Sequence, residues 1–300
     1  MALIAFESRL TVCFVTILLE PSTATSVVGR RARPRRYLMC PPDHFAVTYV
    51  INPWMNLAEP VDPALARRQW DVLRQIYLDL GHTVELIAAV PGLPDMVFAA
   101  NGGLITDGHA LGVRFAHPER AGEASAYLSW LRGAGLRSVT EAEQVNEGEG
   151  DFLVVGGGRD QLILAGTGFR TTPGAHAEVT RLFGLPVVSL RLVDPRFYHL
   201  DTALAVLDEH IVAYYPEAFN AASRRTLRQL FPDAILATAR DAAVFGLNAV
   251  SDGRHVVLSE RATRLSEQLR ERGYQPIGVD LSELHKAGGG AKCCTLEIRS

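Results

Sequence analysis

The residue with the clearest potential for chemistry is Cys293, which follows the segment GGGAK at residues 288–292. Consecutive glycines let the backbone adopt conformations that other residues avoid, so the thiol can be presented at a cavity. The adjacent Lys292 carries a positive charge that would favour the thiolate, the nucleophilic form of cysteine. We therefore predict a reactive thiol at Cys293. The alternative is a flexible glycine-rich tail with two buried cysteines, Cys293 and Cys294.

Two polar residues in the segment HLD at residues 199–201 could act with this thiol. If the segment is a strand, His199 and Asp201 share one face, so an imidazole and a carboxylate could line the same cavity. This pair suits a cationic substrate, because a histidine can protonate a departing amine and then activate water. The alternative is that His199 is a structural histidine.

A third candidate is the acidic segment NEGEGD at residues 146–151, which carries Glu147 and Glu149. Neighbouring carboxylates can hold a guanidinium by paired, charge-assisted hydrogen bonds. The alternative is an exposed acidic turn. The nearby run Gly156-Gly157-Gly158 lacks the spacing of a dinucleotide-binding loop, and a predicted strand follows it instead of a helix. We therefore expect no nucleotide cofactor there.

Helices recur at wide intervals between these segments. The clearest runs from Asp62 to Leu80, where Asp62 can cap the helix, Pro63 occupies its first turn and apolar residues form one stripe. Weaker helical patterns follow at residues 118–134, 174–184, 220–231 and 260–273.

The segments between the helices resemble one another. Residues 98–113, which begin FAANGG, and residues 245–258, which begin FGLNAV, share a frame with an Asp-Gly turn. Residues 151–164 and 203–213 repeat this hairpin pattern loosely. A hairpin with one helix cannot bury its apolar face alone, so such units should pack around a common axis. The sequence therefore predicts an α/β fold, a five-bladed pseudo-symmetric α/β propeller with a central cavity.

In their order along the chain, these motifs resemble the guanidino-modifying enzymes of the pentein, or amidinotransferase, superfamily. This superfamily includes arginine deiminase, dimethylarginine dimethylaminohydrolase and arginine dihydrolase. The likeness runs from about residue 38 to residue 300 and rests on EGEGD, HLD and GGGAKC. It implies the pentein fold, with Cys293 as nucleophile, His199 as general acid and base, and Glu147 as the carboxylate that holds the guanidinium. Glu149 is a rival for this last role, and Cys294 would serve packing.

The resemblance also implies substrate-binding roles for six further residues: Asn52, Asp95, Asn101, Arg114, Arg170 and Asp201. Arg114 and Arg170 match positions that grip the substrate's α-carboxylate, and Asp95 lies in a PDxVF element. Asn52 and Asn101 resemble the arginine dihydrolase branch. Asp201 argues against the dimethylarginine branch, whose members often carry lysine there.

The predicted function is therefore cysteine-dependent hydrolysis of the arginine guanidinium to ornithine, ammonia and carbon dioxide, through a covalent thiouronium intermediate. The alternative is a dimethylarginine dimethylaminohydrolase or an arginine deiminase that yields citrulline. A more remote alternative is a non-catalytic pentein that only binds. Covalent catalysis by a thiol needs no metal and no organic cofactor, so we expect neither.

Composition agrees with a small polar substrate, arginine or a methylated arginine. The 300 residues are 48% hydrophobic, and 30 Lys and Arg against 33 Asp and Glu leave no basic excess for nucleic acid. Four cysteines without a disulfide or zinc spacing indicate reduced thiols in the cytoplasm. A homo-oligomer is left open.

We expect a catalytic domain over residues 37–300 and an N-terminal extension, disordered or translated from an upstream start, over residues 1–36. The apolar run Leu10 to Leu19 has the length of a signal-peptide core, and secretion or anchoring is the alternative, but the run is too short to span a membrane. Because the sequence ends shortly after Cys293, we also expect no second domain that converts ornithine further.

Overall fold

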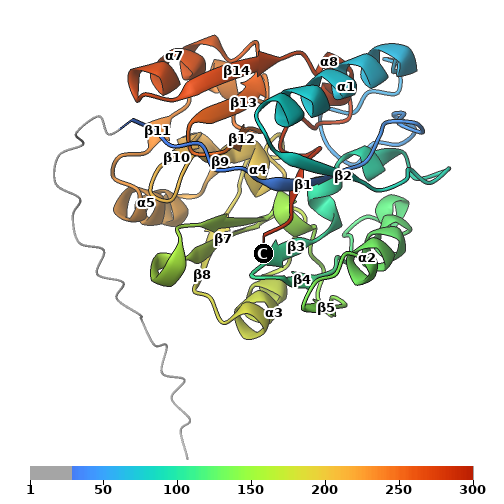
Figure 1. The fold of residues 1–300 in the computed structure, drawn as a ribbon, viewed down its shortest axis with the longest axis horizontal. Helices are drawn as coiled ribbons and strands as arrows, with labels where there is room; N and C mark the ends of the chain where they lie inside the picture. Colours follow the sequence, from blue (N-terminus) through green and yellow to red (C-terminus); the bar gives the residue numbers. More distant parts are fainter. Residues whose placement is uncertain (1–28, 300) are drawn as a thin grey trace, which may run out of the picture.

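Five three-stranded sheets surround a common axis in the computed structural model, which describes residues 29–299 (Figure 1). In each sheet the middle strand pairs antiparallel with the first strand and parallel with the third. A helix joins the middle strand to the third. The five-bladed α/β propeller predicted from the sequence is thus confirmed.

The blades, each given as first strand, middle strand, helix and third strand, are β15 (Leu296–Glu297), β1 (Arg36–Met39), α1 (Pro63–Asp79) and β2 (Thr83–Leu86); β3 (Leu104–Thr106), β4 (His109–Leu111), α2 (Glu123–Gly133) and β5 (Ser138–Thr140); β6 (Phe152–Val155), β7 (Leu162–Thr167), α3 (Pro173–Phe183) and β8 (Val187–Arg191); β9 (Leu204–Val206), β10 (Val212–Tyr214), α5 (Ala221–Leu230) and β11 (Ile235–Leu236); β12 (Val250–Ser251), β13 (His255–Ser259), α7 (Thr263–Glu271) and β14 (Gln275–Val279).

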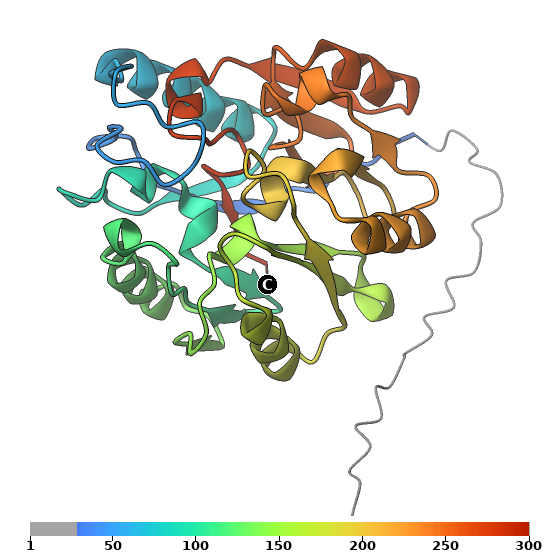
Figure 2. The ribbon, with the colours of Figure 1, turned by 180° about the vertical axis from the view of Figure 1, so that it is seen from behind.

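Local sequence explains the helices. The Asp62 carboxylate caps α1 by accepting from the N–H groups of Ala64 and Leu65, and Pro63 occupies the first turn, as predicted. The chain leaves this helix at Gly81, which has a φ of 82°. The other four predicted helices are present as α2, α3, α5 and α7. All five lie at the rim of the ring, which Figure 2 shows from behind.

The hairpins follow the predicted turns. Asp107 and Gly108, with φ of 50° and 72°, turn the chain between β3 and β4. Positive φ at both central residues is the geometry that matches the twist of paired strands. The first strands of neighbouring blades contact one another, β6 with β9 and β9 with β12, so they line the axis.

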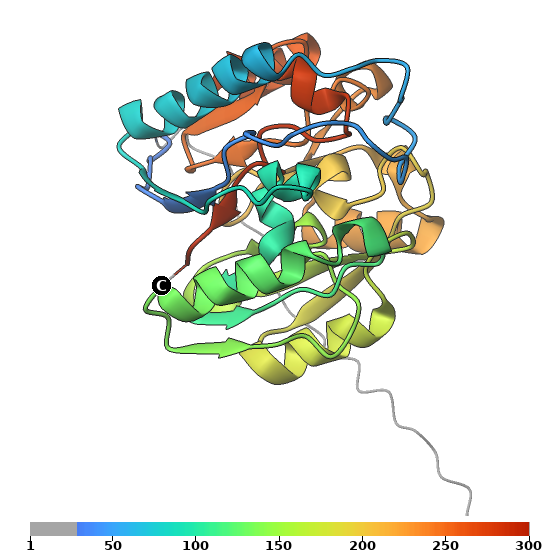
Figure 3. The same cartoon turned by 90° about the vertical axis from the view of Figure 1, so that its right-hand side faces the viewer.

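The ring is closed by the two ends of the described chain. Strand β15 pairs antiparallel with β1, with Tyr37 opposite Glu297 and Leu38 opposite Leu296. Figure 3 shows the C-terminal strand, in red, beside β1, in blue. This blade therefore has no local hairpin.

Apolar side chains pack between the helices and sheets, whereas buried polar residues gather at the axis. The largest apolar cluster joins three blades and includes Leu164, Val212 and Val256. Buried polar residues instead occupy the segments that lead into the first strands, among them Glu147 and His199. The fold thus keeps its core in the blades and leaves the axis to polar chemistry.

The segment before β1 lies against two other blades. The Arg30 guanidinium pairs with Asp208 and covers the Tyr274 ring, and the Arg33 N–H donates to the Asp252 carbonyl. The domain boundary at residues 36 and 37 stays a prediction. The apolar run Leu10 to Leu19 lies outside the described residues. Between residues 29 and 299, no helix is both long and apolar enough to cross a membrane.

Candidate active site

Four predicted site residues precede the first strands of four different blades. Asn101 comes before β3, Glu147 before β6, His199 before β9 and Cys293 before β15. Since these strands line the axis, the segments that lead into them meet at one end of it. All four side chains are buried. The pseudo-symmetry of the ring therefore gathers residues that are far apart in sequence.

The Cys293 thiol lies beside Asp201, with Sγ 3.4 Å from Asp201 Oδ2. Its backbone carbonyl accepts from the Ala100 N–H, at 2.9 Å. Burial raises the pKa of the Cys293 thiol well above its usual value, and the neighbouring Asp201 carboxylate raises it further. The thiol is therefore protonated in this closed site.

Lys292 does not serve this thiol, contrary to the sequence prediction. Its Nζ donates to Glu149 Oε2 at 2.8 Å and to the Thr295 carbonyl at 2.9 Å. A residue adjacent in a turn points its side chain in another direction, and a buried carboxylate captures the ammonium group. The expectation that Lys292 favours the thiolate was wrong.

His199 is held by Glu147. His199 Nε2 lies 2.7 Å from Glu147 Oε2, and Arg170 Nη1 donates to the same oxygen at 3.0 Å. Burial acts to raise the pKa of Glu147, but the Arg170 guanidinium and His199 outweigh it and hold that pKa well below its usual value. The ionised carboxylate orients the imidazole, whose Nδ1 makes no hydrogen bond with the part of the chain that the structure describes.

The segment around His199 is not a strand, which corrects a second prediction. His199 precedes the short helix α4 (Leu200–Ala203), whose first N–H is held by the Asp151 carboxylate at 3.1 Å. Alternation along a strand therefore does not apply. The turn instead directs His199 to Glu147 and Asp201 to Cys293.

Two carboxylate oxygens in the site are buried without a partner. Asp201 Oδ1 and Asp95 Oδ1 make no hydrogen bond within residues 29–299. Burial raises the pKa of Asp201 to about 6, against the opposing effects of His199 and Lys292, and burial also raises the pKa of Asp95. Both oxygens would be stabilised by N–H donors of a cationic ligand.

Asn101 connects this cluster to an arginine that sequence reasoning missed. Its Nδ2 donates to the Glu147 carbonyl at 3.3 Å, and its Oδ1 accepts from Arg120 Nη1 at 2.8 Å. Arg120 is buried and also pairs with Glu123. An Arg-x-x-Glu pair at the start of a helix equally fits an exposed helix surface. No sequence signal therefore marked Arg120.

The two predicted carboxylate-gripping arginines differ in their placement. Arg170 is buried, pairs with Glu147 and lies over the Tyr198 ring, 4.7 Å from its centroid. Arg114 is exposed, and its Nη1 donates to the Glu143 carbonyl at 3.2 Å. The structure gathers Arg170 into the cluster and leaves Arg114 at the surface.

Residues 49–52 cover the cluster. The Tyr49 hydroxyl donates to Asp95 Oδ2 at 2.9 Å, and the Ile51 carbonyl accepts from Arg170 Nη2 at 2.9 Å. Asn52 Nδ2 donates to the Ala287 carbonyl at 3.0 Å, next to the glycine-rich segment. Asn52 therefore ties this covering segment to the chain that presents Cys293.

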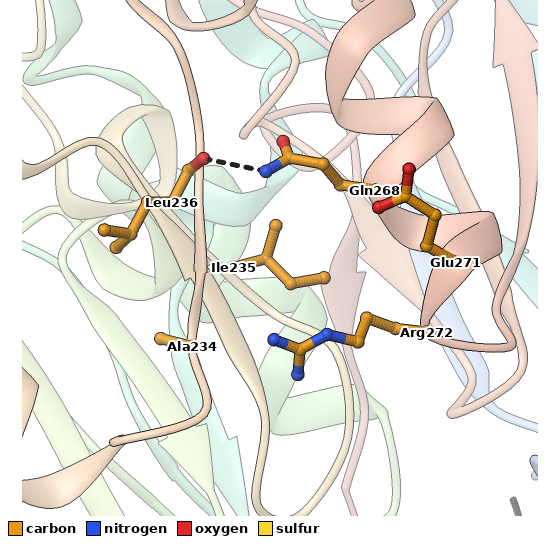
Figure 4. Close-up of a pocket in the computed structure, with 6 residues that line it drawn as sticks. All are labelled: Ala234, Ile235, Leu236, Gln268, Glu271 and Arg272. Carbon is orange, nitrogen blue, oxygen red and sulfur yellow. Dashed lines mark hydrogen bonds between the residues drawn. The ribbon is translucent and has the colours of Figure 1, made fainter.

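A separate hollow of about 240 Å³ lies between β11 and α7, far along the chain from these motifs (Figure 4). It is lined by Ala234, Ile235, Leu236, Gln268, Glu271 and Arg272. Its single labelled hydrogen bond joins Gln268 Nε2 to the Leu236 carbonyl. None of the predicted site residues lines it. Among residues 29–299, no group of three or more His, Cys, Asp or Glu is placed to hold a metal ion.

Comparison with known proteins gives related enzymes. The family model for N,N dimethylarginine dimethylhydrolase, eukaryotic, matches residues 50–300. The N(G),N(G)-dimethylarginine dimethylaminohydrolase of Mycobacterium tuberculosis is 59% identical over 273 residues, which cover 91% of this chain and 89% of that protein. The bifunctional arginine dihydrolase/ornithine cyclodeaminase ArgZ of Synechocystis is 39% identical over 88% of this chain, which spans only 37% of that protein.

Solved structures show the same fold. The N-terminal domain of ArgZ, in a mutant form bound to substrate, matches with a TM-score of 0.84 and 38% identity over 89% of this chain and 98% of that one. A dimethylarginine dimethylaminohydrolase (DDAH) from Pseudomonas aeruginosa, complexed with citrulline, matches with a TM-score of 0.73 and 20% identity over 88% of this chain and 99% of that one. The predicted pentein fold is confirmed.

Proposed function

We propose, because this chain belongs to the eukaryotic N,N-dimethylarginine dimethylhydrolase family, that its substrate is L-arginine and that hydrolysis continues to ornithine. The broader activity is shared by the named relatives: this protein is a hydrolase of guanidino C–N bonds. The choice of arginine is our own proposal.

The observation that carries the proposal is the set of buried polar atoms without partners among the described residues, Asp201 Oδ1, Asp95 Oδ1 and His199 Nδ1. An unmodified arginine guanidinium offers five N–H donors in a planar array. Dimethylation of one terminal nitrogen removes two of these donors. An unmodified guanidinium is therefore better suited to satisfy several acceptors at once.

In the proposed mechanism, the bound guanidinium brings a positive charge next to Cys293 and so lowers the pKa of its thiol. The thiol proton passes to Asp201 Oδ2 as the sulfur–carbon bond forms. His199 then protonates the departing nitrogen, the carbon–nitrogen bond breaks, and ammonia leaves a thiouronium adduct. Glu147 stabilises the positive charge on His199 throughout.

Water completes the first cycle. His199 removes a proton from the water that attacks the thiouronium carbon, the sulfur–carbon bond breaks, and the sulfur regains its proton from Asp201. Citrulline results. A second cycle on the ureido group releases another ammonia and carbon dioxide, and leaves ornithine. The neutral amide of Asn101 supports this step, because an amide tolerates a neutral ureido group better than a carboxylate does.

Further residues complete the proposed site. We assign Glu147, and not Glu149, to the catalytic carboxylate, because Glu147 contacts His199 whereas Glu149 pairs with Lys292 and Arg299. Asp95 and Asn52 would frame the substrate's amino-acid end. The buried Arg170 would bind its α-carboxylate, and the exposed Arg114 would do so only if its side chain turns inward.

A second candidate is hydrolysis of asymmetric dimethylarginine to citrulline and dimethylamine. It is favoured by the relative that is 59% identical and bears that name. One terminal nitrogen of this substrate keeps both N–H donors, so Asp201 could still bind it. The two candidates share the Cys293 chemistry and differ in their products.

The test is to incubate purified protein separately with L-arginine and with asymmetric dimethylarginine, and to resolve products by mass spectrometry. Ornithine from arginine is the expected result. Citrulline with dimethylamine from the methylated substrate, and no ornithine from arginine, would move the assignment to the second candidate. No product from either substrate would contradict both.

A further inference from the structure

Asn248 occupies, in the remaining blade, the place that a site residue occupies in each of the other four. It is fully buried and lies two residues before β12, the first strand of its blade. In the repeated frames FAANGG and FGLNAV it stands where Asn101 stands in the other repeat. The ring therefore directs Asn248 to the same end of the axis as Cys293.

The Asn248 carboxamide contacts the nucleophile on two sides. Its Oδ1 accepts from the Cys293 N–H at 3.0 Å, and its Nδ2 donates to Cys293 Sγ at 3.0 Å. Nδ2 also donates to the Asp201 carbonyl at 3.2 Å. A backbone N–H only donates and a carbonyl only accepts, so these partners determine which end of the amide faces the sulfur.

We propose that Asn248 is a further catalytic residue, whose Nδ2–H stabilises the negative charge on Cys293 Sγ as the sulfur–carbon bond forms and breaks, while its Oδ1 holds the Cys293 backbone. This inference rests on the proposed function. A fixed N–H donor aimed at an atom where charge develops acts like an oxyanion-hole donor.

The surroundings of the sulfur explain why such a donor is needed. Burial and the Asp201 carboxylate both raise the pKa of the Cys293 thiol, and Lys292 is engaged elsewhere. The neutral amide opposes this effect without itself exchanging protons. The chain is also built closely around it: a Cβ at Gly290 would lie 2.9 Å from Asn248 Oδ1, so only glycine lets the backbone pass there unhindered.

The test compares Asn248→Asp and Asn248→Ala with the wild-type protein. Both variants lose the Nδ2 donor, whereas aspartate keeps an oxygen for the Cys293 N–H. Asn220→Asp is the matched control, because Asn220 caps α5 through its Oδ1 and aspartate caps equally well. The readouts are kcat and KM for the better of the two substrates, and the pH dependence of Cys293 alkylation by iodoacetamide, followed by peptide mass spectrometry.

We expect the alkylation midpoint to move to higher pH in both Asn248 variants and kcat to fall roughly 100-fold, the usual effect of losing one such donor. Asn220→Asp should match the wild-type protein in both readouts. If Asn248→Asp does not fold, Asn248→Ala alone decides.

An unchanged alkylation midpoint would overturn the inference even if kcat fell, because a purely structural role predicts that result. Wild-type kcat in either variant would also overturn it. Failure of the proposed function looks different: Cys293→Ser would then keep turnover, or the wild-type protein would turn over neither substrate.

Discussion

Asp201 illustrates, at the scale of one residue, a charge that the fold holds for chemistry at the expense of stability. Its carboxylate is fully buried beside a thiol, and burial raises its pKa from 3.8 to about 6. A group whose pKa is raised on folding favours the folded state below the unfolded pKa, and loses that advantage as the pH rises through the folded value. The ionised Asp201 therefore opposes folding at neutral pH.

Asp201→Asn should thus stabilise the protein while it abolishes turnover. Two pKa units correspond to about 3 kcal/mol, so unfolding free energy at pH 8 should rise by up to about that amount, with little change at pH 4. Urea unfolding at the two pH values, with kcat at pH 8, measures both effects. An equal gain at both pH values would contradict the electrostatic explanation.

The two adjacent cysteines provide the second prediction at this scale. Cys293 contacts Asp201 and Asn248, whereas Cys294 is fully buried in an apolar cluster. Cys293→Ser should reduce kcat by at least about 1000-fold, since serine is a far weaker nucleophile than cysteine here. Cys294→Ser should keep kcat per folded molecule and lower stability by about 1–3 kcal/mol. Turnover assays with thermal unfolding measure this, and the reverse pattern would shift the nucleophile by one residue.

At the scale of elements, the close approach of two short turns sets the geometry of the site. These turns are η2 (Ala99–Gly102), which carries Asn101, and η4 (Gly148–Gly150), which follows Glu147. Gly148 has a φ of 55°, and a Cβ there would lie 2.5 Å from the Gly103 carbonyl oxygen. Only glycine allows this contact.

Gly148→Ala should therefore separate the turns. We expect a loss of roughly 1–3 kcal/mol in unfolding free energy, together with reduced kcat, because the Asn101–Glu147 hydrogen bond lies at this contact. Gly133→Ala, at the end of α2 with open space around it, is the control and should be neutral or stabilising by up to about 1 kcal/mol. Urea unfolding and turnover of both variants measure the difference, and equal behaviour would exclude the steric argument.

At the scale of the whole molecule, Glu149 joins the closure of the ring to its third blade. It is fully buried, accepts from Lys292 Nζ at 2.8 Å and from the Glu297 N–H at 3.1 Å, and pairs with Arg299. Burial acts to raise its pKa, but Arg299 and Lys292 outweigh this and lower it overall. These contacts connect the turn before β6 to strand β15.

Glu149→Gln should consequently weaken the ring and spare the chemistry. Removing one partner of a buried ion pair costs about 3–5 kcal/mol, because the remaining charges stay buried and unpaired. The kcat per folded molecule should stay near the wild-type value, whereas Glu147→Gln should lose turnover with a smaller effect on folding. Active-site titration with iodoacetamide corrects kcat for the folded fraction. Loss of kcat in Glu149→Gln alone would exchange the roles of the two carboxylates.

The predictability of the site varied from residue to residue for physical reasons. The contact of His199 with Glu147 was within reach of motif reasoning, because both residues lie in distinctive short segments. Arg120 and Asn248 were not, since their importance comes from partners far along the chain. The direction of Lys292 depended on a buried carboxylate contributed by another blade.

Features that depend on near neighbours along the chain could be read from the sequence: the five helices with their caps and periodicity, the Asp-Gly hairpin turns, the repeat of hairpin and helix, and the order of the three motifs. The three-dimensional fold was needed to show how the ring closes through β1 and β15, which side chains face the axis, and which charges pair there. The reason is range. Turns and helices follow from local backbone energetics, whereas buried charges find partners from other blades only after the ring has formed.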